Sequence, residues 1–144
     1  MRKSVLALIA LGLALGGCAA EGFAEPPAGD KPANVEAIAG SSLKKITLAE
    51  KASQRLGIKT AAVATSTVDG QQLTTVPYGA LLYDPAGKTW VYTNPQPLVF
   101  VRHEVTVVRI AKDIVLLSAG PPAGTQVVTV GVAELYGAEV GVGK

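Results

Sequence analysis

Few residues of this 144-residue chain are of the types that carry catalysis or bind metal ions. It has one cysteine, Cys18, and one histidine, His103. Zinc and copper(I) sites need several thiolate, thioether or imidazole ligands, so these residues cannot build one and we expect no metal site. Ser118 and Asp113 could join His103 in a hydrolytic triad, but no nucleophile-elbow motif surrounds the serine. We therefore predict a protein that is not an enzyme and uses no cofactor.

The surroundings of Cys18 predict a different chemistry for this residue. Arg2 and Lys3 form a basic start, and an apolar stretch follows at residues 5–15. Two glycines then precede the cysteine directly. The apolar stretch is far shorter than the roughly 20 residues that span a bilayer. A basic start, a short apolar core and small residues before the cut are typical of a secretory signal peptide.

The order of these parts resembles a bacterial lipoprotein signal peptide with its lipobox. The resemblance implies that residues 1–17 are removed and that Cys18 becomes the first residue, carrying acyl chains such as palmitate. The alternative is an ordinary secretory signal with a free cysteine nearby. Removal of Arg2 and Lys3 leaves 11 basic against 11 acidic residues, so the mature chain is formally neutral. Because no basic surface is expected, we predict no nucleic-acid partner.

The segment after the cysteine is predicted to be a tether. Residues 25–30 and 40–42 are rich in Pro, Gly and Ser, and no apolar period is sustained around them. Such segments bury too little surface to offset the entropy of ordering them. We therefore expect a lipidated cysteine and flexible tether at residues 18–45, and one folded domain at residues 46–144.

The folded domain is predicted to begin with a short helix. Thr47 is expected to be its N-cap, and Glu50, three residues later, would complete a capping box. Apolar residues recur at positions 48, 52 and 56, which share one helix face. Gly57 is expected to end the helix in a left-handed conformation.

From residue 58 onward the pattern predicts β structure. Asp69-Gly70 is a hairpin turn signal, residues 84–87 and Lys112-Asp113 are predicted turns, and residues 120–124 a loop. The expected strands lie within residues 58–68, 71–76, 80–83, 88–93, 98–110, 114–117 and 127–130. One helical turn is expected at residues 132–136. Six to eight short antiparallel strands favour a small β-barrel or sandwich.

Several segments of this domain resemble the periplasmic adaptor subunits of efflux pumps, the membrane fusion protein family. The segments that carry the likeness are residues 46–60, Val76-Pro77 with the strand that follows it, Arg102-His103-Glu104-Val105 and residues 120–131, and the likeness covers about residues 46–63 and 75–136. It implies the β-barrel and membrane-proximal part of an adaptor. Full adaptors carry a lipoyl-like sandwich and a long α-helical hairpin between the first two blocks. Here only residues 65–74 separate them, so neither can fit and no bridge to an outer-membrane channel is expected.

The resemblance implies a lipid-anchored accessory component of an RND-type efflux system that acts by protein–protein contact. Its partner would be an inner-membrane transporter or a full-length adaptor. We expect the contacts in loops that rigid strands position. The candidate contact residues are Asp84, Pro85, Gly87, Trp90, Tyr92, Pro121 and Pro122.

A ligand-binding function is the alternative. Trp90 and Tyr92 fall on one face of a strand, where they could form a stacking platform or belong to the core. A stand-alone lipoprotein with a small β-barrel would use them to hold a small molecule. Either function places the protein in the cell envelope, facing the periplasm or the extracellular side. Ala19 after the cysteine resembles outer-membrane sorting, whereas a pump adaptor would stay on the inner membrane, so the choice of membrane stays open.

Overall fold

The structure is a computed structural model that describes residues 31–142. The predicted signal peptide and Cys18 lie outside the described residues. The elements are β1 (Ala33–Ala37), β2 (Lys44–Leu48), α1 (Glu50–Leu56), β3 (Lys59–Ala62), β4 (Ala64–Val68), β5 (Gln71–Pro77), η1 (Tyr78–Ala80), β6 (Leu82–Tyr83), β7 (Thr89–Gln96), β8 (Val99–Glu104), β9 (Thr106–Ala111), β10 (Ile114–Ala119), β11 (Gln126–Val130) and α2 (Val132–Val140). No helix among residues 31–142 is long and apolar enough to cross a membrane.

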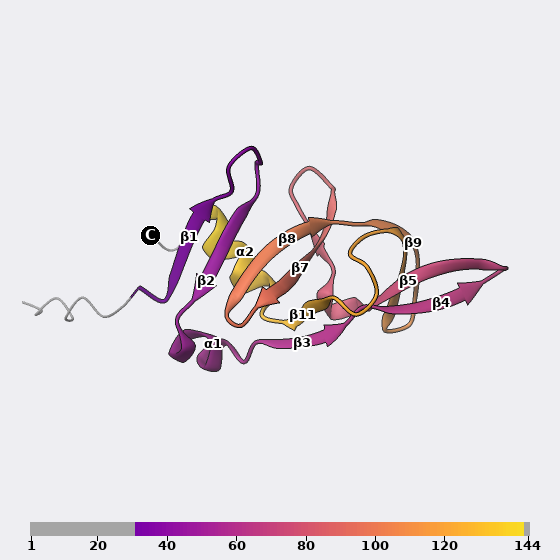
Figure 1. Cartoon of the computed structure of the whole chain (residues 1–144), viewed down its shortest axis with the longest axis horizontal. Helices are drawn as coiled ribbons and strands as arrows, with labels where there is room; N and C mark the ends of the chain where they lie inside the picture. The colour runs from indigo at the N-terminus through magenta and orange to yellow at the C-terminus, as the bar shows by residue number, and fades with distance from the viewer. Residues whose placement is uncertain (1–30, 143–144) are drawn as a thin grey trace, which may run out of the picture.

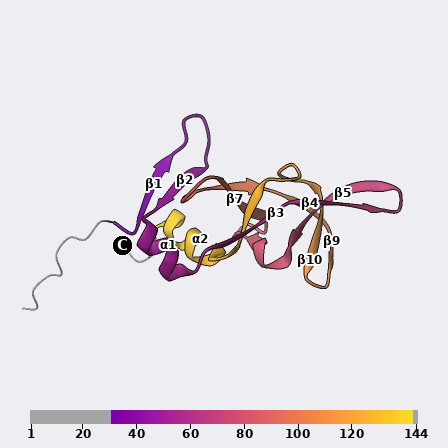
Figure 2. The same cartoon turned by 60° about the horizontal axis from the view of Figure 1, so that its bottom comes forward.

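The strands form two antiparallel sheets. The larger sheet has the order β1-β2-β8-β7-β11-β3, with β6 paired to β7, and the smaller sheet has the order β4-β5-β10-β9. Both views show the two helices and β1 at one end of an elongated molecule, with the smaller sheet at the other end (Figures 1 and 2).

At two places the chain passes directly from a strand of the larger sheet to a strand of the smaller sheet. A single buried valine lies between the two strands at each crossing. Val63 separates β3 from β4, and Val105 separates β8 from β9. The Val63 N–H donates to the Thr125 carbonyl over 2.8 Å, and the Val105 N–H donates to the Thr89 carbonyl over 2.9 Å. Both side chains enter the same apolar cluster. The sheets are therefore joined by two short chain crossings whose valines lie in one apolar cluster.

Two apolar clusters form the core. One lies where the sheets meet and the other lies beneath α2. β7 contributes Val91 to the first and Tyr92 to the second, and β11 contributes Val127 and Val128 in the same way. Because neighbouring side chains of a strand point to opposite faces, these two strands are buried on both faces. They are the centre on which the rest of the domain packs.

The predicted mainly β fold of antiparallel strands is confirmed, but residues 31–142 form eleven strands and not six to eight. The run at residues 98–110 is cut in two at Val105, where the chain changes sheet. The Asp69-Gly70 hairpin turn is confirmed, with φ values of 52° and 77°, as is the left-handed Gly57 at the end of α1. These signals are local, which is why the sequence alone predicts them.

Part of the predicted tether is folded. β1 and β2 form an antiparallel hairpin in which Val35 lies opposite Ile46 and Glu36 opposite Lys45. Glu36 and Lys45 form an ion pair at 2.6 Å. Ala33 and Val35 also pack against the cluster beneath α2. The folded domain therefore includes residues 33–45. Two small apolar side chains are enough to fix β1 in the sheet, because β2 pairs with the strand and both side chains pack against the cluster beneath α2.

The predicted start of the first helix and the predicted end of the second helix are both wrong. Thr47 lies inside β2, and the N-cap of α1 is Ala49, which makes no side-chain capping bond. The predicted capping box is therefore wrong: β2 pairs with β1 and β8, which keeps Thr47 extended. α2 is longer than the single turn predicted. It starts after Gly131, whose φ is 94° and whose Cβ, if present, would lie 2.1 Å from the Ile58 Cδ1 atom.

Candidate functional site

The face of β7 that carries Trp90 and Tyr92 is covered and does not form an open platform. The two side chains are 8% and 0% exposed, respectively. Tyr92 lies in the cluster beneath α2, together with Leu135 of that helix. The prediction that Trp90 and Tyr92 contact a partner directly is therefore wrong, because α2 covers Tyr92 and Arg102 lies over the Trp90 ring.

A buried carboxylate holds α2 against this face. Glu139 is 3% exposed and lies between two strands. The Tyr92 hydroxyl of β7 donates to its Oε2 over 2.5 Å, and the Arg102 Nη2 of β8 lies 3.0 Å from its Oε1. The Lys44 Nζ of β2 donates to the Glu139 backbone carbonyl over 2.8 Å. One residue near the end of α2 thus binds three strands of the larger sheet.

Arg102 extends this cluster toward the molecular surface. Its guanidinium lies 4.4 Å from the centre of the Trp90 ring and 5.6 Å from that of Tyr136. Arginine over an aromatic face is attracted by the ring quadrupole. The Trp90 Nε1 in turn donates to Asp84 Oδ2 over 3.0 Å. A continuous chain of polar and stacking contacts therefore joins α2 to the loop at residues 84–88.

Asp84 fixes the shape of that loop. Its Oδ1 accepts hydrogen bonds from the backbone N–H groups of Ala86 and Lys88, both over 2.9 Å. Gly87 closes the turn with a φ of 80°. Desolvation acts to raise the pKa of Asp84, but the hydrogen bonds from Trp90, Lys88 and Ala86 outweigh it and hold the pKa below its usual value. The carboxylate is thus ionised at neutral pH and keeps the loop ordered.

Of the seven candidate contact residues, four lie at the surface. Pro85, Gly87 and Pro122 are exposed, and Asp84 is half-buried. Pro121 is fully buried, so its predicted contact with a partner is wrong, like those of Trp90 and Tyr92. The proline packs inward because the loop at residues 120–124 lies on the strand crossing, where the Gly124 N–H donates to the Val63 carbonyl.

The structure does not assemble the residues that could have formed a hydrolytic triad. His103 is exposed on β8 opposite Val91. The Ser118 hydroxyl donates to the Thr106 carbonyl over 3.5 Å, and the Asp113 carbonyl accepts from the Tyr78 N–H. Among residues 31–142, no three His, Cys, Asp or Glu side chains gather as metal ligands would.

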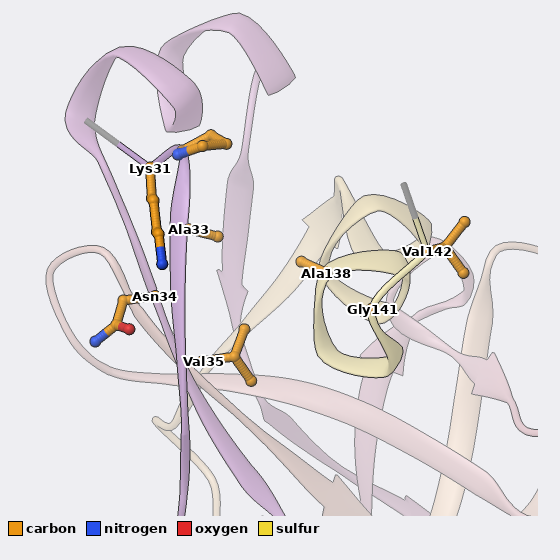
Figure 3. A pocket seen from close by; sticks show the side chains of 8 residues that line it. Lys31, Ala33, Asn34, Val35, Ala138, Gly141 and Val142 are labelled. Carbon is orange, nitrogen blue, oxygen red and sulfur yellow. The ribbon is translucent and has the colours of Figure 1, made fainter. Parts of the chain in front are cut away.

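A pocket of about 530 Å³ lies between β1 and the carboxyl end of α2 (Figure 3). Ala33, Val35 and Ala138 supply small apolar walls, and Lys31 and Asn34 lie at one side. Its volume is in the range of small-molecule sites. It shares no lining residue with the Glu139 cluster.

The chain matches no protein-family model, no curated protein and no solved structure. The resemblance to periplasmic adaptor subunits therefore stays a prediction from the sequence.

Glu139, the residue around which the cluster forms, is not among the residues predicted from the sequence. The signal was the helical period after Gly131: Val132, Leu135, Tyr136 and Glu139 fall on one face at i, i+3, i+4 and i+7. Because Glu139 shares a face with three apolar residues, the pattern indicates that its carboxylate is buried against a polar or cationic side chain. A helix that ends at residue 136, as predicted, would leave Glu139 outside this face.

The buried ion pair predicts a large effect of one isosteric change. Glu139→Gln removes the negative charge and leaves Arg102 without its counter-ion, and Arg102 is only 14% exposed. We expect the free energy of unfolding to fall by about 3 kcal/mol. Glu134→Gln, an exposed change in the first turn of the same helix, is the matched control and should stay within about 0.5 kcal/mol. Urea denaturation of both variants measures the difference, and equal stabilities would show that the pair does not hold α2.

Tyr92 predicts how the stability depends on alkaline pH. Burial, and then its hydrogen bond to Glu139, raise the pKa of Tyr92 above its ordinary value. Above pH ~10 the unfolded chain releases this proton while the folded protein keeps it, so stability should fall by about 1.4 kcal/mol per pH unit from this residue. Below pH ~10 the contribution is constant.

Tyr92→Phe removes this pH-dependent term. The variant should be less stable than the wild type at pH 8, since it loses a hydrogen bond to a carboxylate, but its stability should decline less between pH 10 and pH 11. Tyr78→Phe is the control, because Tyr78 is 51% exposed. Denaturation curves recorded across this range give both slopes, and parallel slopes for the wild type and Tyr92→Phe would contradict the prediction.

Proposed function

We propose that the protein is a lipid-anchored, non-enzymatic accessory component of an efflux system of the RND type, acting by contact with an inner-membrane transporter or a full-length adaptor. The anchor would be acylated Cys18. The contact surface would be the loop at residues 84–88 together with Tyr83, the exposed residue that precedes it.

The order of the Asp84 loop is the observation that carries the proposal. Its backbone is held by the Asp84 carboxylate, and the carboxylate is held by Trp90. A loop that is already ordered loses little conformational entropy when a partner binds. Tyr83, which immediately precedes the loop, is 53% exposed, and tyrosine is enriched at protein interfaces. The loop therefore combines order and exposure, as a protein-binding surface requires.

The resemblance to adaptor subunits indicates which adaptor contact this chain could make. The residues that separate the two blocks of the resemblance form the β4–β5 hairpin, which turns at Asp69-Gly70. Where a full adaptor would carry its long extension, this chain has a short hairpin at the end of the molecule (Figure 1). Contact with the transporter side of a pump is thus the part of adaptor function that this chain could retain.

The alternative is a stand-alone ligand-binding lipoprotein. Its best support is the pocket between β1 and α2 (Figure 3). The aromatic pair that motivated it does not line that pocket, and both of its members are buried in the Glu139 cluster. The protein-contact function therefore has the stronger support.

Site-specific photo-crosslinking tests the proposed contact. A photoreactive amino acid replaces Ala86, at the tip of the loop, and in a control chain it replaces Ala111, an exposed alanine of the smaller sheet. After irradiation of whole cells, we expect a crosslinked product with a transporter or adaptor subunit from the Ala86 chain, at several times the yield from the Ala111 chain. Mass spectrometry of the product identifies the partner. Recovery of no pump component, in cells where a known adaptor is captured, would reject the proposal.

Membrane fractionation tests the anchor separately. Wild-type protein should stay with membranes after washing with alkaline carbonate, since two or more acyl chains hold a protein stably on a bilayer. Cys18→Ser should be released into the soluble fraction with its domain folded. The mass of the amino-terminal peptide of each protein serves as the control for acylation and cleavage. A Cys18→Ser protein that is cleaved but still resists the wash would show that Cys18 is not the anchor.

A further inference from the structure

The exposed face of α1 carries positive charge that the structure does not neutralise. Lys51 and Arg55 are one helical turn apart, and the Arg55 Nε donates to the Lys51 carbonyl over 3.3 Å. With Gln54 they line a shallow hollow at the surface. Among residues 31–142, neither side chain takes part in an ion pair. Lys59, two residues beyond Gly57, is exposed as well.

The distribution of charge along the molecule is uneven. Residues 49–59 hold three cations and one acid, Glu50, whose carboxylate accepts a hydrogen bond from Gln54. At the other end, the hairpins at residues 64–77 and 106–119 hold two cations and two acids. Among residues 31–142 the α1 end thus presents an excess of positive charge. The acids that make the chain after residue 17 formally neutral include Glu21, Glu25 and Asp30, which precede the described residues.

This end is also where the chain from Cys18 enters the domain. The Ala49 N–H, just before α1, donates to the Pro32 carbonyl over 3.0 Å, which fixes the start of the described chain beside the helix. Both views place the start of β1 and α1 at the same end of the molecule, away from the smaller sheet (Figures 1 and 2). Thirteen residues lie between Cys18 and Lys31, counting Lys31, so even a fully extended chain would span only about 45 Å.

We propose that the cationic face of α1, centred on Lys51 and Arg55, binds the surface of an anionic phospholipid membrane and sets the orientation of the domain on it. The inference rests on the lipid anchor in the proposed function, which would hold this face close to the bilayer. Each Lys or Arg near an anionic membrane surface contributes about 1 kcal/mol. Two or three cations alone bind weakly, but a tether converts this contact into an intramolecular one with a high effective concentration.

Vesicle binding without the acyl chains tests the electrostatic contact by itself. The protein is the chain from residue 18 to residue 144 with Cys18→Ser, and the vesicles contain either equal parts of phosphatidylglycerol and phosphatidylcholine or phosphatidylcholine alone. We expect sedimentation with the anionic vesicles at low salt and not with the neutral ones. Binding should disappear at high ionic strength, because salt screens contacts between exposed charges.

Charge reversal locates the contact on the molecule. Lys51→Glu/Arg55→Glu should lower the partition coefficient on anionic vesicles by about tenfold or more. Arg109→Glu/Lys112→Glu makes the same change in net charge on the smaller sheet and should lower it by about twofold at most. Circular dichroism confirms that each variant is folded. Lys51→Gln/Arg55→Gln, which keeps good helix formers, provides a second measurement and should give an intermediate loss.

Equal losses in the two charge-reversed variants would overturn the proposal, since net charge and not α1 would then govern binding. Unchanged binding of Lys51→Glu/Arg55→Glu, or equal binding to neutral vesicles, would overturn it too. The assay contains neither a transporter nor an acyl chain. A negative result here therefore leaves the proposed efflux role standing, and a failure to crosslink a pump component leaves the vesicle result standing.

Discussion

The position of α2 depends on one buried carboxylate. Glu139 is hydrogen-bonded to Tyr92, paired with Arg102, and fastened through its backbone carbonyl to Lys44. Burying a charge is costly unless it is paired and its oxygens are satisfied, and here both oxygens have a partner. The helix that these bonds fix supplies Val132 and Leu135 to the second apolar cluster. Without this docking, the β2, β7 and β8 side chains beneath the helix would lose their cover.

The same arginine links the helix to the loop at residues 84–88. Arg102 stacks on Trp90, and Trp90 holds Asp84, which shapes the loop through two backbone N–H groups. A cooperative polar network of this kind rigidifies a structure when every member has a partner. Among residues 31–142 every buried side-chain nitrogen and oxygen has one. The loop proposed as a contact surface is therefore braced from the core, although Trp90 itself cannot reach a partner.

The features that the sequence predicted are those that depend on neighbouring residues. Asp69-Gly70 and Gly57 adopt positive φ values because turns and helix ends demand them locally. The shared face of Trp90 and Tyr92 also follows from the strand period. The burial of this face does not, because its cover depends on α2, more than forty residues later. The sheet crossings at Val63 and Val105, the β1 strand and the partners of Glu139 are likewise set by contacts between distant segments, and a single sequence carries no local sign of them.

The described domain contains no cysteine, so no disulfide supports it. Its cohesion rests on apolar clusters on both faces of the larger sheet's central strands and on the Glu139 network that holds α2. This arrangement gives the molecule two different ends. One end carries α1, the start of the described chain and an excess of cations among the described residues, and the other carries neutral hairpins. The proposed contact loop at residues 84–88 joins β6 and β7 of the larger sheet, which also contains β1, so an anchor that precedes β1 would orient the loop through the hydrogen bonds of this one sheet.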